Sequence, residues 1–238
     1  MTITTNDIEM SLSEHLEELR QRMFLSFGVF LAFTGVGLGF IKKIVTLLQA
    51  PALGVKFLQL APGEFFFTSV KVAFFFGALI VSPFLIYQLF LFIVPGMTVN
   101  ERQILLPFAL SSGTLFFLGV GFSYWVLIPA ALNFFINYGS DVVEPLWSFE
   151  QYLDFVLLIL LSTGLCFQVP IIQVVLGLTG IVTSEKMLSS WRYVVLGSTI
   201  IGAILTPSTD PITQILLSSA ILALFLSGCF ILSLLESK

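Results

Sequence analysis

Charged residues are scarce in this chain. Asp, Glu, Lys and Arg make up 10% of its 238 residues, and it has a single histidine, His15. The chain is 57% hydrophobic, and a soluble domain of this length cannot bury that much apolar surface in one core. A lipid bilayer accepts such a composition. The scarcity of charge therefore predicts an integral membrane protein. Long apolar runs without short alternating segments favour helical spans.

Residues that support catalysis or metal binding are equally rare. The two cysteines, Cys166 and Cys229, lie far apart inside apolar runs, and no Cys-x-x-Cys pair suggests a metal or redox site. The sequence has no His-Glu-x-x-His motif, no glycine-rich phosphate loop and no evident serine partner for its histidine. The net charge is −4 and no basic patch is present, which argues against a nucleic-acid partner. We therefore expect a protein that is not an enzyme and binds no cofactor or metal.

The apolar runs predict the fold class. Six of them, separated by polar loops, indicate an all-α polytopic membrane protein with one domain over residues 1–238. The fifth run has about 14 residues, roughly 21 Å of helix, against a hydrocarbon core roughly 30 Å thick. We therefore expect the fifth and sixth helices to be a short pair. An interfacial helix is expected at about 11–22, and spans at about 23–41, 69–93, 105–136, 152–178, 192–206 and 212–235.

The distribution of Lys and Arg predicts the orientation. With an even number of spans, both termini lie on one side of the membrane. That side carries six basic residues: Arg20, Arg22, Arg102, Lys186, Arg192 and Lys238. The four on the other side all flank the first outer loop: Lys42, Lys43, Lys56 and Lys71. Because basic residues favour the inner side, both termini are expected to be cytoplasmic or stromal.

The densest charged stretch, residues 13–22, precedes the first span. It contains Glu14, Glu17, Glu18 and the chain's histidine. Glu18 and Arg22 are one helical turn apart and can form an ion pair. Two interpretations remain open for this stretch: a solvated face that anchors the first span, or a surface that binds a ligand.

A second carboxylate belongs to the same side of the membrane. Glu101 lies two predicted crossings after Glu18, so the topology brings both to one surface. Carboxylates facing a shallow site favour a guanidinium ligand, whose planar fork bonds them bidentately. Phe90 and Phe92 at the end of the second span can supply an aromatic wall beside such a site. The simpler alternative is that Glu101 is solvated or pairs with Arg102.

Ionisable residues inside the predicted spans are almost absent. Lys71 and Asp154 lie near span ends, and the deepest polar side chain is Gln168, which does not titrate. Ion-coupled transporters normally carry ionisable groups along their pathway. This argues against a secondary transporter, which stays as an alternative together with a structural subunit of another membrane complex.

Several short motifs, in order along residues 11–235, resemble those of one known family. The first is His15-Leu16-x-Glu18-Leu19-Arg20-x-Arg22, directly before a span. The others are Phe92-Ile93-Val94-Pro95, Asn100-Glu101-Arg102, Phe167-Gln168-Val169-Pro170, Arg192-Tyr193, and Leu205-Thr206-Pro207 with Asp210 and Gln214. Together with six predicted spans, they resemble the TatC family, the receptor subunits of the twin-arginine protein translocase.

The resemblance implies a function. Members of this family bind signal peptides that carry paired arginines and start the transport of folded proteins across a bacterial plasma membrane or a thylakoid membrane. They work with single-span partners of the TatA and TatB type, self-associate in the receptor complex, and are driven by the proton-motive force.

The resemblance also implies residue roles. Glu18 and Glu101 match the carboxylates that bind the signal's arginines, with Phe92 beside them, and Arg20 and Arg22 match positions that orient this surface. Other matches fall at positions implicated in partner docking or structure: Thr206, Gln214, Pro51, Gln168 and Asp210. Many relatives carry glutamate where this chain has Gln168, so a mechanism that requires a buried ionised carboxylate there does not transfer.

Overall fold

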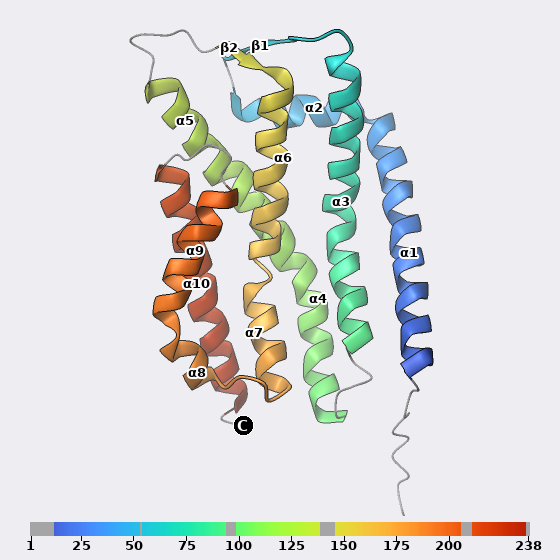
Figure 1. The fold of residues 1–238 in the computed structure, drawn as a ribbon, viewed down its shortest axis with the longest axis vertical. Helices are drawn as coiled ribbons and strands as arrows, with labels where there is room; N and C mark the ends of the chain where they lie inside the picture. The colour runs from blue at the N-terminus through green and yellow to red at the C-terminus, as the bar shows by residue number, and fades with distance from the viewer. Residues whose placement is uncertain (1–11, 53, 94–98, 139–145, 206–210, 237–238) are drawn as a thin grey trace, which may run out of the picture.

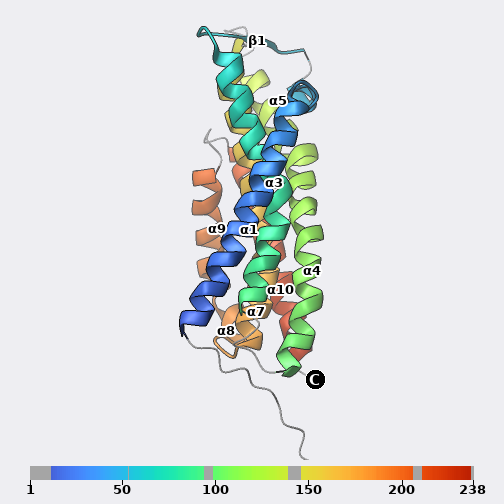
Figure 2. The same cartoon turned by 90° about the vertical axis from the view of Figure 1, so that its right-hand side faces the viewer.

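The computed structural model describes residues 12–52, 54–93, 99–138, 146–205 and 211–236. Its helices line up along the long axis of the molecule (Figure 1). Within the described residues, five helices are long and apolar enough to cross a membrane, and the apolar helix Trp191–Ile204 is shorter. The expected all-α, polytopic membrane architecture is confirmed. The beginning of α1 and the end of α10 lie at the same end of the bundle, called the terminal end below (Figures 1 and 2).

Helix α1 (Leu12–Gly39) is a single continuous helix at the edge of the bundle. It includes both the expected interfacial helix and the expected first span, because no proline interrupts the sequence between them. Its main partner is α3 (Glu64–Ile93). The two helices approach closely at Gly77, where an added Cβ would lie 2.4 Å from Oγ1 of Thr34. Close backbone approach at small residues is typical of helix packing in membranes.

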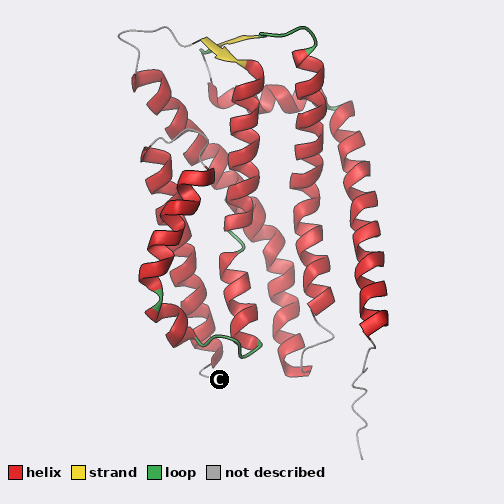
Figure 3. Ribbon diagram, viewed as in Figure 1, coloured by secondary structure: helices red, strands yellow, loops and turns green. Residues whose placement is uncertain are grey.

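The third and fourth apolar runs are each interrupted. A π-helical turn, η3 (Ser123–Leu127), joins α4 (Val99–Phe122) to α5 (Ile128–Tyr138) and ends two residues before Pro129. The helix α6 (Phe149–Cys166) ends before Pro170, and α7 (Val169–Leu178) continues in the same direction (Figure 3). Proline cannot donate a backbone hydrogen bond and clashes with the preceding turn, which accounts for both interruptions.

The last helices differ in length. A short helix, α8 (Ser184–Ser189), leads into α9 (Trp191–Leu205), whose 15 residues span about 22 Å at 1.5 Å per residue. The expectation of a short fifth helix is therefore confirmed. The expectation of a short sixth helix is wrong, because α10 (Pro211–Glu236) has 26 residues. Its apolar sequence continues past one bilayer thickness to Glu236, without a proline after its first residue.

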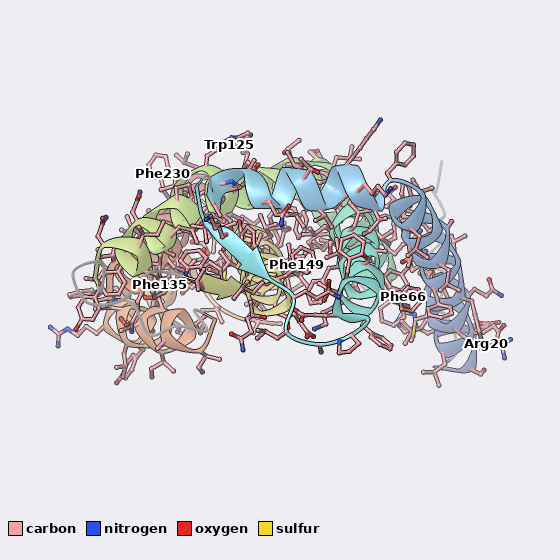
Figure 4. All side chains as sticks on the ribbon, turned by 90° about the horizontal axis from the view of Figure 1, so that it is seen from above. Arg20, Phe66, Trp125, Phe135, Phe149 and Phe230 are labelled. Carbon is pink, nitrogen blue, oxygen red and sulfur yellow. The ribbon has the colours of Figure 1, made fainter. Side chains whose placement is uncertain are left out.

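The opposite end of the bundle, called the outer end below, is covered by short elements. Helix α2 (Ile41–Gln49) lies across it (Figures 1 and 4) and continues into the 3-10 turn η1 (Ala50–Ala52). Strand β1 (Lys56–Leu58) pairs in parallel with β2 (Leu146–Ser148), with Phe57 opposite Trp147. No pattern in the sequence predicts this pairing.

Ionic contacts join α3 and α6 at the outer end. The carboxylate of Glu64 accepts hydrogen bonds from the backbone N–H groups of Ala61 (3.0 Å) and Glu150 (3.2 Å). Lys71 Nζ lies 2.9 Å from the carboxylates of both Glu150 and Asp154. Lys71 therefore links α3 to α6.

The core centres on α6. Leu153, Val156 and Leu157 are almost completely buried among residues of α2, α5 and α10. A second cluster joins α7, α8 and α10, with Leu232 fully buried. Helix α1 contributes no residue to these clusters, so its position depends on α3 and on the contacts described next.

Candidate functional site

The start of α1, the end of α3 and the start of α4 all lie at the terminal end of the bundle (Figures 1 and 2). The sequence places Glu18 on the first of these segments, Phe92 on the second and Glu101 on the third. The three segments therefore lie at one end of the bundle, with α3 in contact with both α1 and α4. The side chain of Glu101 lies outside the described residues, although its backbone is helical in the first turn of α4.

Glu18 is held by an arginine of its own helix. Arg22 Nε donates to Glu18 Oε1 at 3.0 Å, and Arg22 Nη2 donates to the same oxygen. The predicted ion pair one turn apart is confirmed. Both side chains are partly buried, at 21% exposed for Glu18 and 24% for Arg22. A charge-assisted contact that is partly shielded from water is stronger than a solvated surface pair.

Arg22 also reaches across to α3. Its Nη1 donates to Oε1 of Gln88 at 2.7 Å. Gln88 is not among the site residues that the sequence predicts. Its spacing of four residues from Phe92 puts both on one face of α3, but no local pattern indicates that α1 passes that face.

The second oxygen of Glu18 has a different environment. Glu18 Oε2 is buried, and no donor among the described residues bonds it. His15 Nδ1 lies 3.9 Å away, and the His15 ring stacks on Phe92 with centroids 4.1 Å apart. Phe92, which the sequence predicts beside the carboxylates, therefore lies next to the His15 ring near Glu18. Phe90 is instead buried against Ile171 in the bundle.

Two other charges of α1 form a separate ion pair. Arg20 pairs with Glu17, and its side chain is 64% exposed. It lies at the outer edge of the molecule, away from α3 (Figure 4). Gln21 donates to the same Glu17 carboxylate at 3.3 Å. Arg20 and Arg22 thus have separate partners, and only Arg22 contacts Glu18.

An apolar cavity of about 290 Å³ adjoins the Glu18–Arg22 pair. It lies between α1 and α3, and it is lined by Leu19, Met23, Leu85, Leu89, Phe92 and Leu165 together with Arg22 and Gln88. An apolar cavity beside a few convergent polar groups is the usual form of a ligand site.

The other predicted residues do not gather in one place. Gln214 on α10 donates to the backbone oxygen of Thr199 on α9 at 3.2 Å. Gln168 is buried at the α6–α7 break and donates to the backbone oxygen of Ser112 on α4 at 3.2 Å. Pro51 lies in η1 at the outer end. Thr206 and Asp210 lie outside the described residues.

Groups that support metal binding are absent from the described part of the chain, where no three His, Cys, Asp or Glu side chains come together. The two thiols, Cys166 and Cys229, are free.

Comparisons with known proteins show which family the chain resembles. The family model described as "Sec-independent protein translocase protein (TatC)" matches residues 14–219. A relative from Synechocystis sp., named Sec-independent protein translocase protein TatC, is 58% identical over 94% of this chain and 88% of its own length. The chloroplastic TATC of Pisum sativum is 53% identical over 96% of this chain and 65% of its own length.

A solved structure has the same fold. The crystal structure described as "Twin Arginine Translocase Receptor- TatC" superimposes with a TM-score of 0.81 and 33% sequence identity. The match covers 94% of this chain and 100% of the other. Relatives occur in a cyanobacterium and in chloroplasts, consistent with a bacterial plasma membrane or a thylakoid membrane. The chain therefore belongs to the TatC family, the multi-pass membrane components of the Sec-independent protein translocase, and is not an enzyme.

Proposed function

We propose that this protein is the core receptor of a twin-arginine translocase. It binds twin-arginine signal peptides through Glu18 and Glu101 on its cytoplasmic or stromal face. It recruits single-span partners of the TatA and TatB type, self-associates in the receptor complex, and exports folded proteins with the proton-motive force. The observation that carries the proposal is that Glu18 already holds a guanidinium, that of Arg22.

The chemistry of the site favours arginine over lysine. A carboxylate accepts two parallel N–H groups from a guanidinium, whereas an ammonium is a compact point charge that lacks this planar fork. Phe92, stacked on His15 beside Glu18, offers an aromatic face to a cationic side chain. Glu101, in the first turn of the neighbouring α4, supplies a second carboxylate for the second arginine of the pair.

The two alternatives, a secondary transporter and a structural subunit, predict different results. A secondary transporter would take up a substrate when this protein alone is placed in liposomes. A structural subunit would tolerate neutralisation of Glu18. The Glu18 carboxylate is only 21% exposed, yet one of its oxygens has no donor among the described residues. A buried acceptor of this kind costs stability unless a ligand bonds it, which disfavours both alternatives.

Neutralising Glu18 is expected to weaken signal-peptide binding. Glu18→Gln removes the charge and keeps the shape, and hydrogen bonds to charged groups contribute about 1.5–3 kcal/mol, so affinity should fall roughly tenfold to a hundredfold. The measurement is the Kd of a fluorescent twin-arginine signal peptide for the protein in nanodiscs. Glu17→Gln is the matched control, because Glu17 pairs with exposed Arg20 on the same helix, and its Kd should stay at the wild-type value. Equal values for both variants would favour the structural-subunit alternative.

A further inference from the structure

The guanidinium that occupies Glu18 belongs to the protein itself. Arg22 uses Nε and Nη2 for Oε1 of Glu18, and Nη1 for Gln88 on α3. All three nitrogens of its guanidinium are therefore engaged. An arginine held on both sides in this way is fixed in position, because its planar fork leaves few ways to rotate without losing a bond.

We propose that Arg22 is an internal competitor of the signal peptide: it occupies Glu18 in the resting receptor, and a signal arginine binds by replacing it. Gln88 sets how firmly the competitor is held. This inference rests on the proposed function and adds to it a regulatory step and a residue, Gln88, that none of the family motifs contains.

The geometry requires exchange instead of simple addition. One oxygen of Glu18 already accepts two bonds from Arg22. The other is buried, with the His15 ring, stacked on Phe92, as its near neighbour. An incoming guanidinium therefore cannot bond both oxygens of Glu18 while Arg22 and the ring pair stay in place.

Exchange is also energetically accessible. Arg22 and Glu18 are each more than a fifth exposed, so a released Arg22 can be solvated and is not left as a buried unpaired charge. The cost of release is mainly the lost bonds to Glu18 and Gln88. This cost lowers the fraction of receptors that are ready to bind, and the apparent affinity falls by that fraction.

An internal competitor has a specific consequence for selectivity. Because it lowers the affinity of every ligand by the same factor, it leaves the ratio between arginine and lysine peptides unchanged. It raises the threshold that any ligand must exceed. A twin-lysine peptide, which lacks the planar fork, then falls below useful affinity while a twin-arginine peptide does not.

Removing the acceptor on α3 tests the exchange. Gln88→Met keeps the length of the side chain and loses the bond to Arg22. The Kd of a twin-arginine peptide, measured with the protein in nanodiscs, should fall roughly fivefold, the value of about one hydrogen bond to a charged group that is partly solvated. The Kd of a twin-lysine peptide should fall by the same factor. Gln21→Met is the matched control, because Gln21 neighbours Arg22 in sequence but contacts Glu17.

The outcomes separate this inference from the proposed function. Suppose that binding selects arginine and depends on Glu18, but that Gln88→Met leaves the affinity unchanged or weakens it. This result would overturn the exchange alone and would mean that Arg22 only holds Glu18 in place. Loss of arginine selectivity in the wild type, or indifference to Glu18→Gln, would overturn the proposed function. Should Gln88→Met fail to insert, Arg22→Lys keeps the charge and loses the fork, and the same gain in affinity is expected from it.

Discussion

Replacing Glu18 or Glu101 by alanine is expected to abolish crosslinking of a twin-arginine signal peptide. Each substitution removes a carboxylate that, under the proposed function, bonds one guanidinium of the arginine pair, and a bidentate charged contact has no substitute from water in a partly buried site. In Glu18→Ala, Arg22 also loses its partner and adds a competing positive charge at the site. The measurement is the yield of crosslink between a peptide with a photoreactive residue beside its arginines and the membrane-inserted receptor.

The control for this prediction is assembly. Glu18 lies outside the buried clusters of the bundle, so Glu18→Ala should insert and accumulate like the wild type, and the same is expected of Glu101→Ala. Glu17→Ala should crosslink normally, since Glu17 accepts hydrogen bonds from Arg20 and Gln21, two exposed residues of its own helix. Normal crosslinking in the Glu18→Ala, Glu101→Ala double variant would refute the assignment of the site.

Gly228→Ala is expected to destabilise the bundle. An added Cβ would lie 2.0 Å from Oε1 of Gln173 and 2.9 Å from the Cα of Pro170. Gln173 cannot move away without cost, because it is buried and donates to the backbone oxygen of Phe225 at 3.2 Å. Forcing an extra methyl group into a packed interface costs about 1–3 kcal/mol. The free energy of unfolding in a denaturant titration of the detergent-solubilised protein should fall by this amount.

The same substitution at Gly197 is the control. Gly197 lies within α9, and an added Cβ would meet nothing within 4 Å. Alanine is the better helix former by about 1 kcal/mol, so Gly197→Ala should be neutral or stabilising. If both alanine variants unfold alike, the close contact between α7 and α10 does not exist as described.

Local features of the sequence predict most of the helices and one contact of the site. Apolar runs predict the spans because a bilayer requires them, and Pro170 predicts the break in the fourth span. The Glu18–Arg22 pair follows from helical spacing alone. The match to the family motifs, in turn, directs attention to Phe92, which the structure brings to His15.

Contacts between distant segments were not predictable in the same way. Gln88 bonds Arg22 across 66 residues, and nothing local to either residue indicates the register of α1 against α3. Strands of three residues, such as β1 and β2, carry too little alternation to be recognised. Phe90 and Phe92 look equivalent in the sequence. Residues two positions apart on a helix, however, point in directions that differ by about 200°. Phe90 is therefore buried in the bundle, whereas Phe92 stacks on His15.

The most direct test of the central claim is to map where the arginine pair of a signal peptide contacts the wild-type receptor. A twin-arginine peptide with a photoreactive residue beside the pair is crosslinked in the membrane, and the linked receptor peptides are identified by mass spectrometry. The claim predicts crosslinks in the first turns of α1 and α4 and at the end of α3 near Phe92, and none of comparable yield with a twin-lysine peptide. Crosslinks that fall instead on α9 and α10, or equal yields from both peptides, would contradict it.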